Sequence, residues 1–189
     1  AAKTGALGNR HIVQAVADIV QRFDFPLVVD PVMISKHGAP LLSPDACEAL
    51  KTRLVPLAYL LTPNLAEAAA LTQQEIGDVG GMRRAARQLC EMGAKAVLVK
   101  GGHLAGDATD VLFDGREWLE FTASRIVTPH THGTGCTYSA AITAELAKGS
   151  DLKTAVSRAK HFITEAIRAH PRLGGGSGPV NHNVAPRGV

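Results

Sequence analysis

The sequence predicts an α/β domain with a mostly parallel sheet, and two observations support this fold class. Residues 26–30, 58–62 and 96–100 are short continuous apolar runs, as expected of strands covered on both faces. The segments between them carry apolar residues at helical spacing. Strands that alternate with helices form parallel sheets, because each crossover helix returns the chain to the start of the next strand.

The first helix has no obvious strand before it. Asn9 is a favourable N-cap for a helix over residues 10–23, whereas residues 1–8 indicate only the end of a strand and a turn. A helix that leads into a parallel strand needs an earlier strand to complete the crossover. We therefore expect residues to precede Ala1 and the first strands to be missing from this sequence. The expected core stripe of the helix consists of Ile12, Val13, Val16, Ile19, Val20 and Phe23.

The later elements follow in regular order. A hairpin over residues 109–113 and 117–121 turns at Asp114-Gly115, a dipeptide typical of hairpin turns. Gly149 ends a helix over residues 136–148. The tail from Leu173 is rich in Gly and Pro, which indicates flexibility. Without an internal repeat or a linker, residues 1–189 form one expected domain. The other expected helices are 44–54, 67–71, 81–92 and 152–169.

Composition excludes several classes of function. The net charge of +3 and the aromatic content of 4% do not suit a nucleic-acid surface. No apolar run is long enough to span a bilayer. Cys47, Cys90 and Cys136 are odd in number and widely spaced, which indicates neither a disulfide framework nor a zinc site. We expect a cytoplasmic protein that binds neither nucleic acid nor membrane.

Polar side chains follow the three apolar runs where each run ends. Asp30, Asn64 and Lys100 stand at these positions, and the loop before Cys136 opens a helix on the same edge if the topology is regular. Ligands of open α/β sheets bind along this carboxyl edge. The pattern therefore favours a phosphate-handling site over chance placement.

The loop His132-Gly133-Thr134-Gly135-Cys136 is the strongest local candidate. Glycines let the backbone approach a ligand, and a helix N-terminus presents unpaired N–H groups to an anion. We expect the helix to lower the pKa of the Cys136 thiol toward neutrality. The alternative is a plain glycine turn before a buried helix.

Two carboxylates are candidates for Mg²⁺ binding. Asn64 and Glu67 are three residues apart at a helix start and can face one point, although the same spacing makes a capping box. Asp30 can orient Mg²⁺-bound water or serve as a cap or turn residue. Lys100 can neutralise a transferring phosphoryl group or can simply be solvated. Val32 and Met33 are either a ligand wall or core, and His103, His130 and His132 can join the site.

The motifs resemble those of one enzyme family. His132-Gly-Thr-Gly-Cys136-Thr-Tyr-Ser-Ala-Ala-Ile142 is similar to the anion-hole motif of hydroxymethylpyrimidine/phosphomethylpyrimidine kinases, in the ribokinase superfamily. Most sugar and pyridoxal kinases of that superfamily carry Asp at the position of Cys136. The stretches around Asn64 and Lys100 and the closing Gly-Pro-Val-Asn-His182 also match the family. The resemblance extends from Lys3 to about His182.

The resemblance implies a ribokinase-like three-layer sandwich that phosphorylates hydroxymethylpyrimidine and its monophosphate, using ATP and Mg²⁺ and allowing a monovalent cation. It implies a small-molecule pyrimidine as partner, and we expect a homodimer. Cys136 is expected to act more as general base than as a passive member of the anion hole. The implied catalytic residues are Cys136, Lys100, Gly133 and Gly135. The implied nucleotide-binding residues are Asp30, Asn64, Lys100, Thr134 and Gly135. The implied substrate-binding residues are Val32, Ala6, Gly5 and Cys136, and Asp30 and Glu67 hold the metal through water.

Two departures from the family limit what the resemblance implies. The family's first portion, with a Gly-rich loop and a Gln that grips the pyrimidine, has no counterpart here. Ala6 stands where the family usually has Met, which leaves the size of the pocket open. The alternatives are a pyridoxal or pyridoxine kinase of the same superfamily and a non-catalytic ligand-binding fragment.

Overall fold

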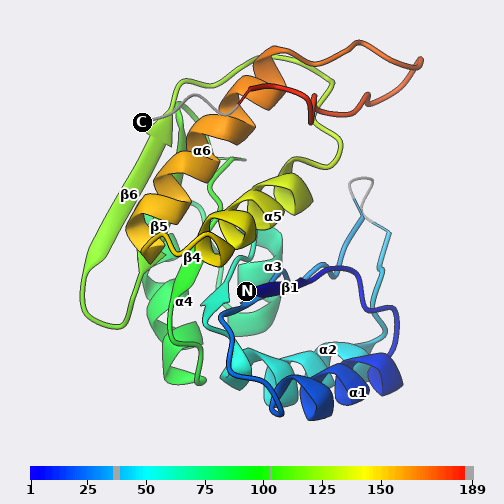
Figure 1. Cartoon of the computed structure of the whole chain (residues 1–189), viewed down its shortest axis with the longest axis vertical. Helices are drawn as coiled ribbons and strands as arrows, with labels where there is room; N and C mark the ends of the chain where they lie inside the picture. The colour runs from blue at the N-terminus through cyan, green and yellow to red at the C-terminus, as the bar shows by residue number, and fades with distance from the viewer. Residues whose placement is uncertain (36–38, 103, 186–189) are drawn as a thin grey trace.

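Within residues 1–35, 39–102 and 104–185, which the computed structural model describes, a six-stranded sheet runs in chain order (Figure 1). Three consecutive strand pairs are parallel and the last two are antiparallel, which confirms the mostly parallel sheet and the hairpin of β5 and β6 that the sequence predicts. The strands are β1 (Ala2–Thr4), β2 (Leu27–Val29), β3 (Leu60–Leu61), β4 (Val97–Val99), β5 (Ala108–Phe113) and β6 (Trp118–Ala123).

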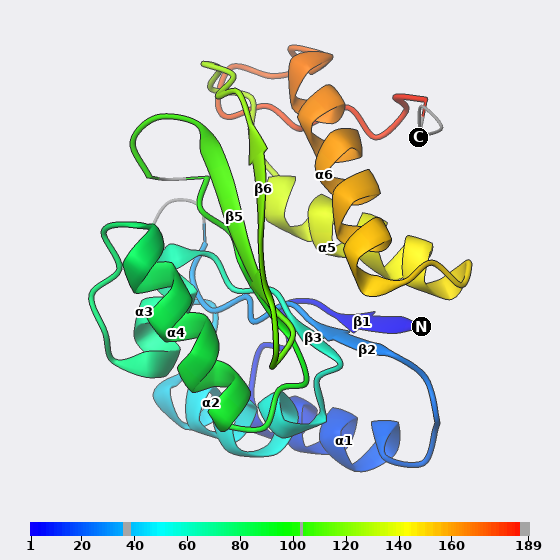
Figure 2. The same cartoon turned by 90° about the vertical axis from the view of Figure 1, so that its left-hand side faces the viewer.

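Helices cover both faces of this sheet (Figure 2). Figure 2 shows α1 to α4 on one side and α5 and α6 on the other. On one side lie α1 (Arg10–Val20), α2 (Pro44–Ala49), α3 (Leu65–Thr72) and α4 (Val79–Glu91), and on the other α5 (Thr134–Ala147) and α6 (Leu152–Arg168). The π-helical turn η1 (Leu50–Leu54) and the 3₁₀ turn η2 (Val55–Leu57) extend α2, so the expected helix 44–54 changes its winding halfway.

The alternation of side chains along the strands explains the two cores. Val28, Leu60 and Leu98 join the core under α5 and α6. Their neighbours Val29 and Leu61 join the core on the opposite face. Because successive strand residues point to opposite faces, a continuous apolar run fills both cores at once.

Residues 1–8, in which the sequence predicts only the end of a strand and a turn, contain the short strand β1 that precedes α1. β1 pairs in parallel with β2, from Ala2 opposite Leu27 to Thr4 opposite Val29. It has three residues, of which Lys3 and Thr4 are polar. A search for apolar runs does not find such a strand, because its pairing depends on backbone hydrogen bonds and not on the type of side chain.

The apolar stripe expected on the first helix is only half right. Val13 and Ala17 are fully buried, whereas Ile12, Ile19 and Phe23 are 45%, 47% and 59% exposed. The helix also ends at Val20 rather than at Phe23. The apolar residues therefore span a wider arc of the helix than the one that faces the sheet.

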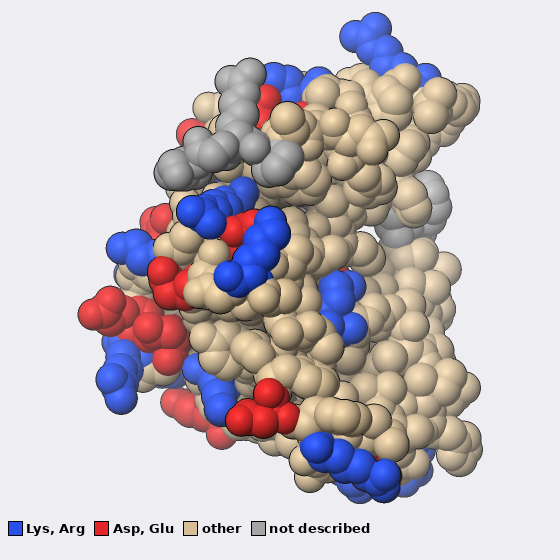
Figure 3. All heavy atoms as spheres, viewed as in Figure 1, with Lys and Arg blue, Asp and Glu red and all other residues tan. Residues whose placement is uncertain are grey.

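Among the described residues, none of the helices is long and apolar enough to cross a bilayer. Basic and acidic side chains are interspersed on the face shown in Figure 3, and the right-hand part of that face carries few charges.

Candidate active site

The predicted convergence of polar residues at the carboxyl edge of the sheet is confirmed. Asn64 and Lys100 form a parallel bridge just beyond β3 and β4, and the Lys100 N–H donates to the Pro63 carbonyl at 2.8 Å. The Lys100 ammonium donates to Asp30 Oδ1 at 3.0 Å. Only 11% of the Lys100 side chain and 2% of the Asp30 side chain are exposed, so this is a buried ion pair rather than a solvated lysine.

Asp30 joins the sheet edge to α5. Its Oδ1 also accepts from Thr62 Oγ1 at 3.2 Å, and its Oδ2 accepts from Ser139 Oγ at 2.9 Å. Asp30 is thus fixed by a cation and two hydroxyls instead of capping a helix. Sequence reasoning missed both hydroxyls. The sequence signal for both is their position: Thr62 ends an apolar run, and Ser139 follows Cys136 by less than one helical turn.

Asn64 and Glu67 form the capping box that opens α3. Asn64 Oδ1 accepts from the Glu67 N–H at 2.9 Å, and Glu67 Oε2 accepts from the Asn64 N–H at 2.8 Å. Burial raises the pKa of Glu67 above its ordinary value. The Lys100 ammonium and the bond from Asn64 offset part of the rise, and the Asp30 carboxylate adds to it. The cap therefore holds a buried carboxylate close to a second one.

The glycine loop meets Lys100. Gly133 caps α5 with φ 82°, a left-handed conformation that suits glycine, and Thr134 is the first helical residue. A Cβ added to Gly135 would lie 3.2 Å from Lys100 Nζ. The first N–H groups of a helix have no acceptor inside it. The Thr134 N–H already donates to the Thr131 carbonyl at 3.3 Å. The N–H groups of Gly135 and Cys136 and the Lys100 ammonium can therefore face one anion.

The expectation of a lowered pKa for Cys136 is wrong. The protein atoms around the thiol raise its pKa above the ordinary value, and the Asp30 carboxylate raises it further. Lys3 and Lys100 act in the opposite direction but do not outweigh these effects. The thiol is therefore mainly protonated at neutral pH, although the residue as a whole is exposed.

The residues expected at the substrate lie at or beside the same edge. Gly5 and Ala6 follow β1, the neighbour of β2, and Val32 follows Asp30 and is half-buried. Met33 is 4% exposed and belongs to the core, not to a ligand wall. Thr4 is buried at the end of β1.

Two of the three candidate histidines hold the closing segment instead. His130 Nδ1 accepts from the Gly178 N–H at 3.2 Å. The His132 N–H donates to Gly178 O at 3.1 Å, and the Val180 N–H donates to His132 O at 3.2 Å. Thr137 Oγ1 lies 2.9 Å from His182 Nε2. The glycine-rich tail is thus attached beside the anion loop, and His103 lies outside the described residues.

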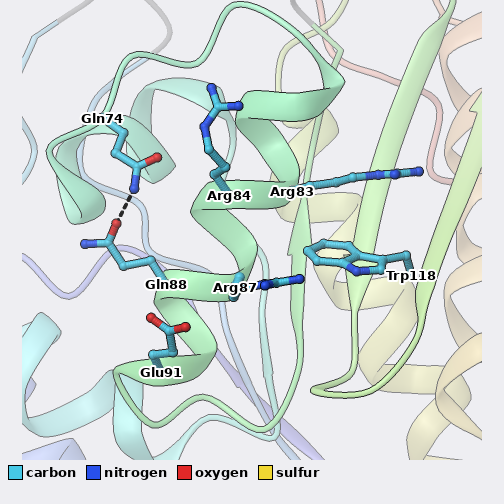
Figure 4. Close-up of a pocket in the computed structure, with 7 residues that line it drawn as sticks. All are labelled: Gln74, Arg83, Arg84, Arg87, Gln88, Glu91 and Trp118. Carbon is cyan, nitrogen blue, oxygen red and sulfur yellow. Dashed lines mark hydrogen bonds between the residues drawn. The ribbon is translucent and has the colours of Figure 1, made fainter.

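A hollow of about 700 Å³ opens elsewhere, between α4 and β6 (Figure 4). Arg83, Arg84, Arg87 and Trp118 line it, and the guanidinium carbons of Arg83 and Arg87 each lie 5.8 Å from the centre of the Trp118 ring. Arg83 also pairs with Glu120 at 2.7 Å. None of the predicted site residues lines this hollow, so we place the candidate chemistry at the sheet edge.

Comparison with known proteins points to one family. A family model described as phosphomethylpyrimidine kinase matches residues 1–181. The chain is 48% identical over 185 residues to a hydroxymethylpyrimidine/phosphomethylpyrimidine kinase of Streptomyces coelicolor. This match covers 98% of the present chain and 69% of that protein. It is 49% identical over 189 residues to the thiamine biosynthesis bifunctional protein ThiED of Geobacter sulfurreducens, covering 99% of this chain but only 39% of that protein.

Solved structures of pyridoxal kinases share the fold. The Bacillus subtilis enzyme in complex with ADP is 40% identical, with a TM-score of 0.87 over 95% of this chain and 68% of that chain. The Staphylococcus aureus enzyme with AMP-PCP is 34% identical, with a TM-score of 0.91 over 98% and 69%. The ribokinase-like α/β architecture is therefore confirmed.

Proposed function

The chain belongs to the phosphomethylpyrimidine kinase family, and from this premise we propose that it transfers the terminal phosphoryl group of ATP to hydroxymethylpyrimidine and its monophosphate in thiamine biosynthesis. The observation that most supports this chemistry is the meeting of Lys100 with the Gly-Thr-Gly-Cys loop. A buried ammonium 3.0 Å from Asp30, and 3.2 Å from the place where a Cβ of residue 135 would stand, provides fixed positive charge where a phosphoryl group needs it.

Each part of the edge then has a role. Lys100 neutralises the charge of the transferring group, and the N–H groups of Gly133, Gly135 and Cys136 donate to its oxygens, whereas the Thr134 N–H donates to the Thr131 carbonyl at 3.3 Å. Asp30, Asn64 and Thr134 face the nucleotide. Gly5, Ala6 and Val32 border the pyrimidine. Because phosphoryl transfer depends mainly on positioning and electrostatics, no covalent enzyme intermediate is needed.

Cys136 acts as the general base through its minor thiolate form. Its raised pKa leaves most of the thiol protonated at neutral pH, but each thiolate that forms is a stronger base. The thiolate removes the proton of the substrate hydroxyl as the oxygen attacks phosphorus. A protonated thiol also avoids repelling the incoming phosphate.

The residues of the edge fit a Mg²⁺ ion that keeps its water ligands. The carboxylates of Asp30 and Glu67 are buried close enough for Asp30 to raise the pKa of Glu67, and a cation would relieve that repulsion. Both carboxylates already accept hydrogen bonds, and the described residues contain no group of three metal-ligating side chains. Contact through water is therefore the arrangement that suits them. When bound, Mg²⁺ would neutralise phosphate charge.

Pyridoxal phosphorylation is the second candidate. The observation that favours it is the similarity to pyridoxal kinases at 34–40% identity with TM-scores of 0.87 to 0.91.

An assay of ADP release with hydroxymethylpyrimidine, its monophosphate and pyridoxal tests both candidates. We expect the two pyrimidines to give the higher kcat/KM. Gly135→Val, which places carbon against Lys100 Nζ, should lower kcat, whereas Gly77→Ala at an open, exposed position should not. Pyridoxal as the best substrate would select the second candidate, and equal activity of Gly135→Val and the parent would refute the placement of the site.

We further propose a homodimer and a cytoplasmic location. The exposed apolar side chains of Ile12, Ile19 and Phe23 on and after α1 support self-association. The odd number of widely spaced cysteines suits a reducing compartment. Light scattering on the purified protein measures the first of these two properties.

A further inference from the structure

One side chain holds the turn that follows Lys100. Arg125, just beyond β6, donates from Nε to the Gly106 carbonyl at 2.7 Å and from Nη1 to the Gly102 carbonyl at 2.6 Å. Its Nη2 donates to the Leu104 carbonyl. A guanidinium is a planar fork of donors, and here all three of its nitrogens bind one short stretch of backbone.

The inner end of the same turn is fixed from the opposite side. The Gly101 N–H donates to Asp110 Oδ1 at 3.0 Å, and Asp110 Oδ2 accepts from Lys160 at 2.7 Å. Gly101 has no room for a side chain, since a Cβ would lie 1.9 Å from the Thr109 carbonyl oxygen. Lys100 therefore leads directly into a closely packed turn, and any displacement of the turn is passed to it.

The outer part of the turn has little other support. Gly102, Ala105, Gly106 and Asp107 are exposed, and Leu104 is only partly buried. Exposed backbone with few packing contacts opens easily unless side chains hold it. Leu104 packs against the core, and the Leu104 N–H donates to the Gly101 carbonyl at 2.9 Å. The three bonds from Arg125 add a side-chain tie to the carbonyls of Gly102, Leu104 and Gly106.

Arg125 also stands at the start of the segment that leads to the anion loop. Residues 124–133 run from the end of β6 to the cap of α5. The guanidinium consequently joins the segment after Lys100 to the segment that leads into the anion loop. Its charge is directed at carbonyl oxygens of the protein, so it serves the site through geometry rather than by binding the phosphate.

We propose that Arg125 is a positioning residue that holds Gly102, Leu104 and Gly106 beyond Lys100 and thereby keeps the Lys100 ammonium between Asp30 and Gly135. The inference rests on the proposed phosphoryl transfer for its effect on turnover. The holding of the turn itself is independent of that function.

The test compares Arg125→Ala and Arg125→Lys with Arg116→Ala, a matched change at an exposed arginine in the β5–β6 turn. Hydrogen–deuterium exchange should become faster at the amides of residues 101, 102 and 104–107 in both Arg125 variants, because Lys cannot reach three carbonyls at once. Reductive methylation of Lys100, followed by mass spectrometry, should become faster by severalfold. The Arg116 variant should match the parent in both measurements.

Turnover should fall roughly ten- to hundredfold in Arg125→Ala, as expected when a charged group is slightly misplaced. The loss should appear in kcat rather than in the KM for ATP, and added guanidinium ion should restore part of it. In a Lys100→Met background, Arg125→Ala should cause little further loss, because the residue acts through Lys100.

Parent-like exchange and methylation in Arg125→Ala would overturn the proposal, and so would an equal loss of turnover with and without Lys100. A variant that unfolds is recognised by its circular dichroism, and Arg125→Lys then provides the same measurements. If the parent shows no turnover while exchange and methylation change as expected, the proposed function fails and the structural role of Arg125 is upheld.

Discussion

Replacing Lys100 by Met should destabilise the fold and remove most of the activity. The change leaves Asp30, which is 2% exposed, without its cation. At an effective dielectric constant of about 20, unit charges 3.0 Å apart attract each other by roughly 5 kcal/mol, and loss of one partner from a buried pair costs about 3–5 kcal/mol. The hydroxyls of Thr62 and Ser139 still donate to Asp30 in the variant, so we expect a loss of stability near the lower end of the range of about 3–5 kcal/mol.

For a chain of this length, such a loss corresponds to a fall in melting temperature of roughly 6–20 °C. Removing a charge-stabilising group from the site should also lower kcat by roughly 10²–10³-fold. Thermal unfolding followed by circular dichroism and the ADP-release assay measure the two effects separately. Lys148→Met is the matched control, because its pair with Glu145 is also a lysine–carboxylate contact but the lysine side chain is 66% exposed. If both variants melt at the same temperature, the ion pair at the sheet edge does not contribute as a buried pair, and the reasoning is wrong.

Burial raises the pKa of Glu67 in the folded chain, so the stabilisation from its protonated form is lost as the pH rises above the ordinary value of 4.5 and through the raised value. Over that range the parent should lose stability relative to Glu67→Gln. A stability difference between the two proteins that stays the same at every pH would contradict this. The same variant should need more Mg²⁺ for half-maximal turnover, which a Mg²⁺ titration measures. Cys136→Ala should lower turnover by about 10²–10⁴-fold. Because the pKa of the thiol is raised, the turnover of the parent should increase with pH above neutrality, and the variant should lack this increase. A parent whose turnover does not change with pH would exclude the base role. Gly101→Ala should prevent correct folding because its Cβ would lie 1.9 Å from the Thr109 carbonyl oxygen, and a parent-like melting curve would disprove the required close approach.

The arrangement of the site follows from the sequence to the extent that it depends on strand direction. Parallel buried strands bring the residues after them to one edge, so Asp30, Asn64 and Lys100 could be grouped from their positions alone. The capping box of α3 could be predicted for the same reason, since its spacing is local.

Features that depend on distance through space could not be predicted. β1 is short and polar, so only its pairing with β2 reveals it. The pKa of Cys136 depends on how much protein surrounds the thiol and on the nearby Asp30, and neither is fixed by its place at a helix start. The exposure of Ile12 and Ile19 depends on which arc of α1 meets the sheet, and periodicity does not determine that arc when apolar residues cover more than one side.

The attachment of the closing segment to His132 and Thr137 has a consequence for the order of biosynthesis. His182 is 45 residues beyond Thr137, so the ribosome completes the anion loop several seconds before it adds the residues that hold it, at about 5–20 residues per second. The sheet strands, by contrast, are all made before that loop. A nascent chain therefore has all residues of the core beneath α1 to α4 before the loop is made, whereas the core beneath α5 and α6 is completed only by later residues, up to Val180. Slowing translation within residues 140–180 should lengthen the interval in which the loop is exposed to proteases.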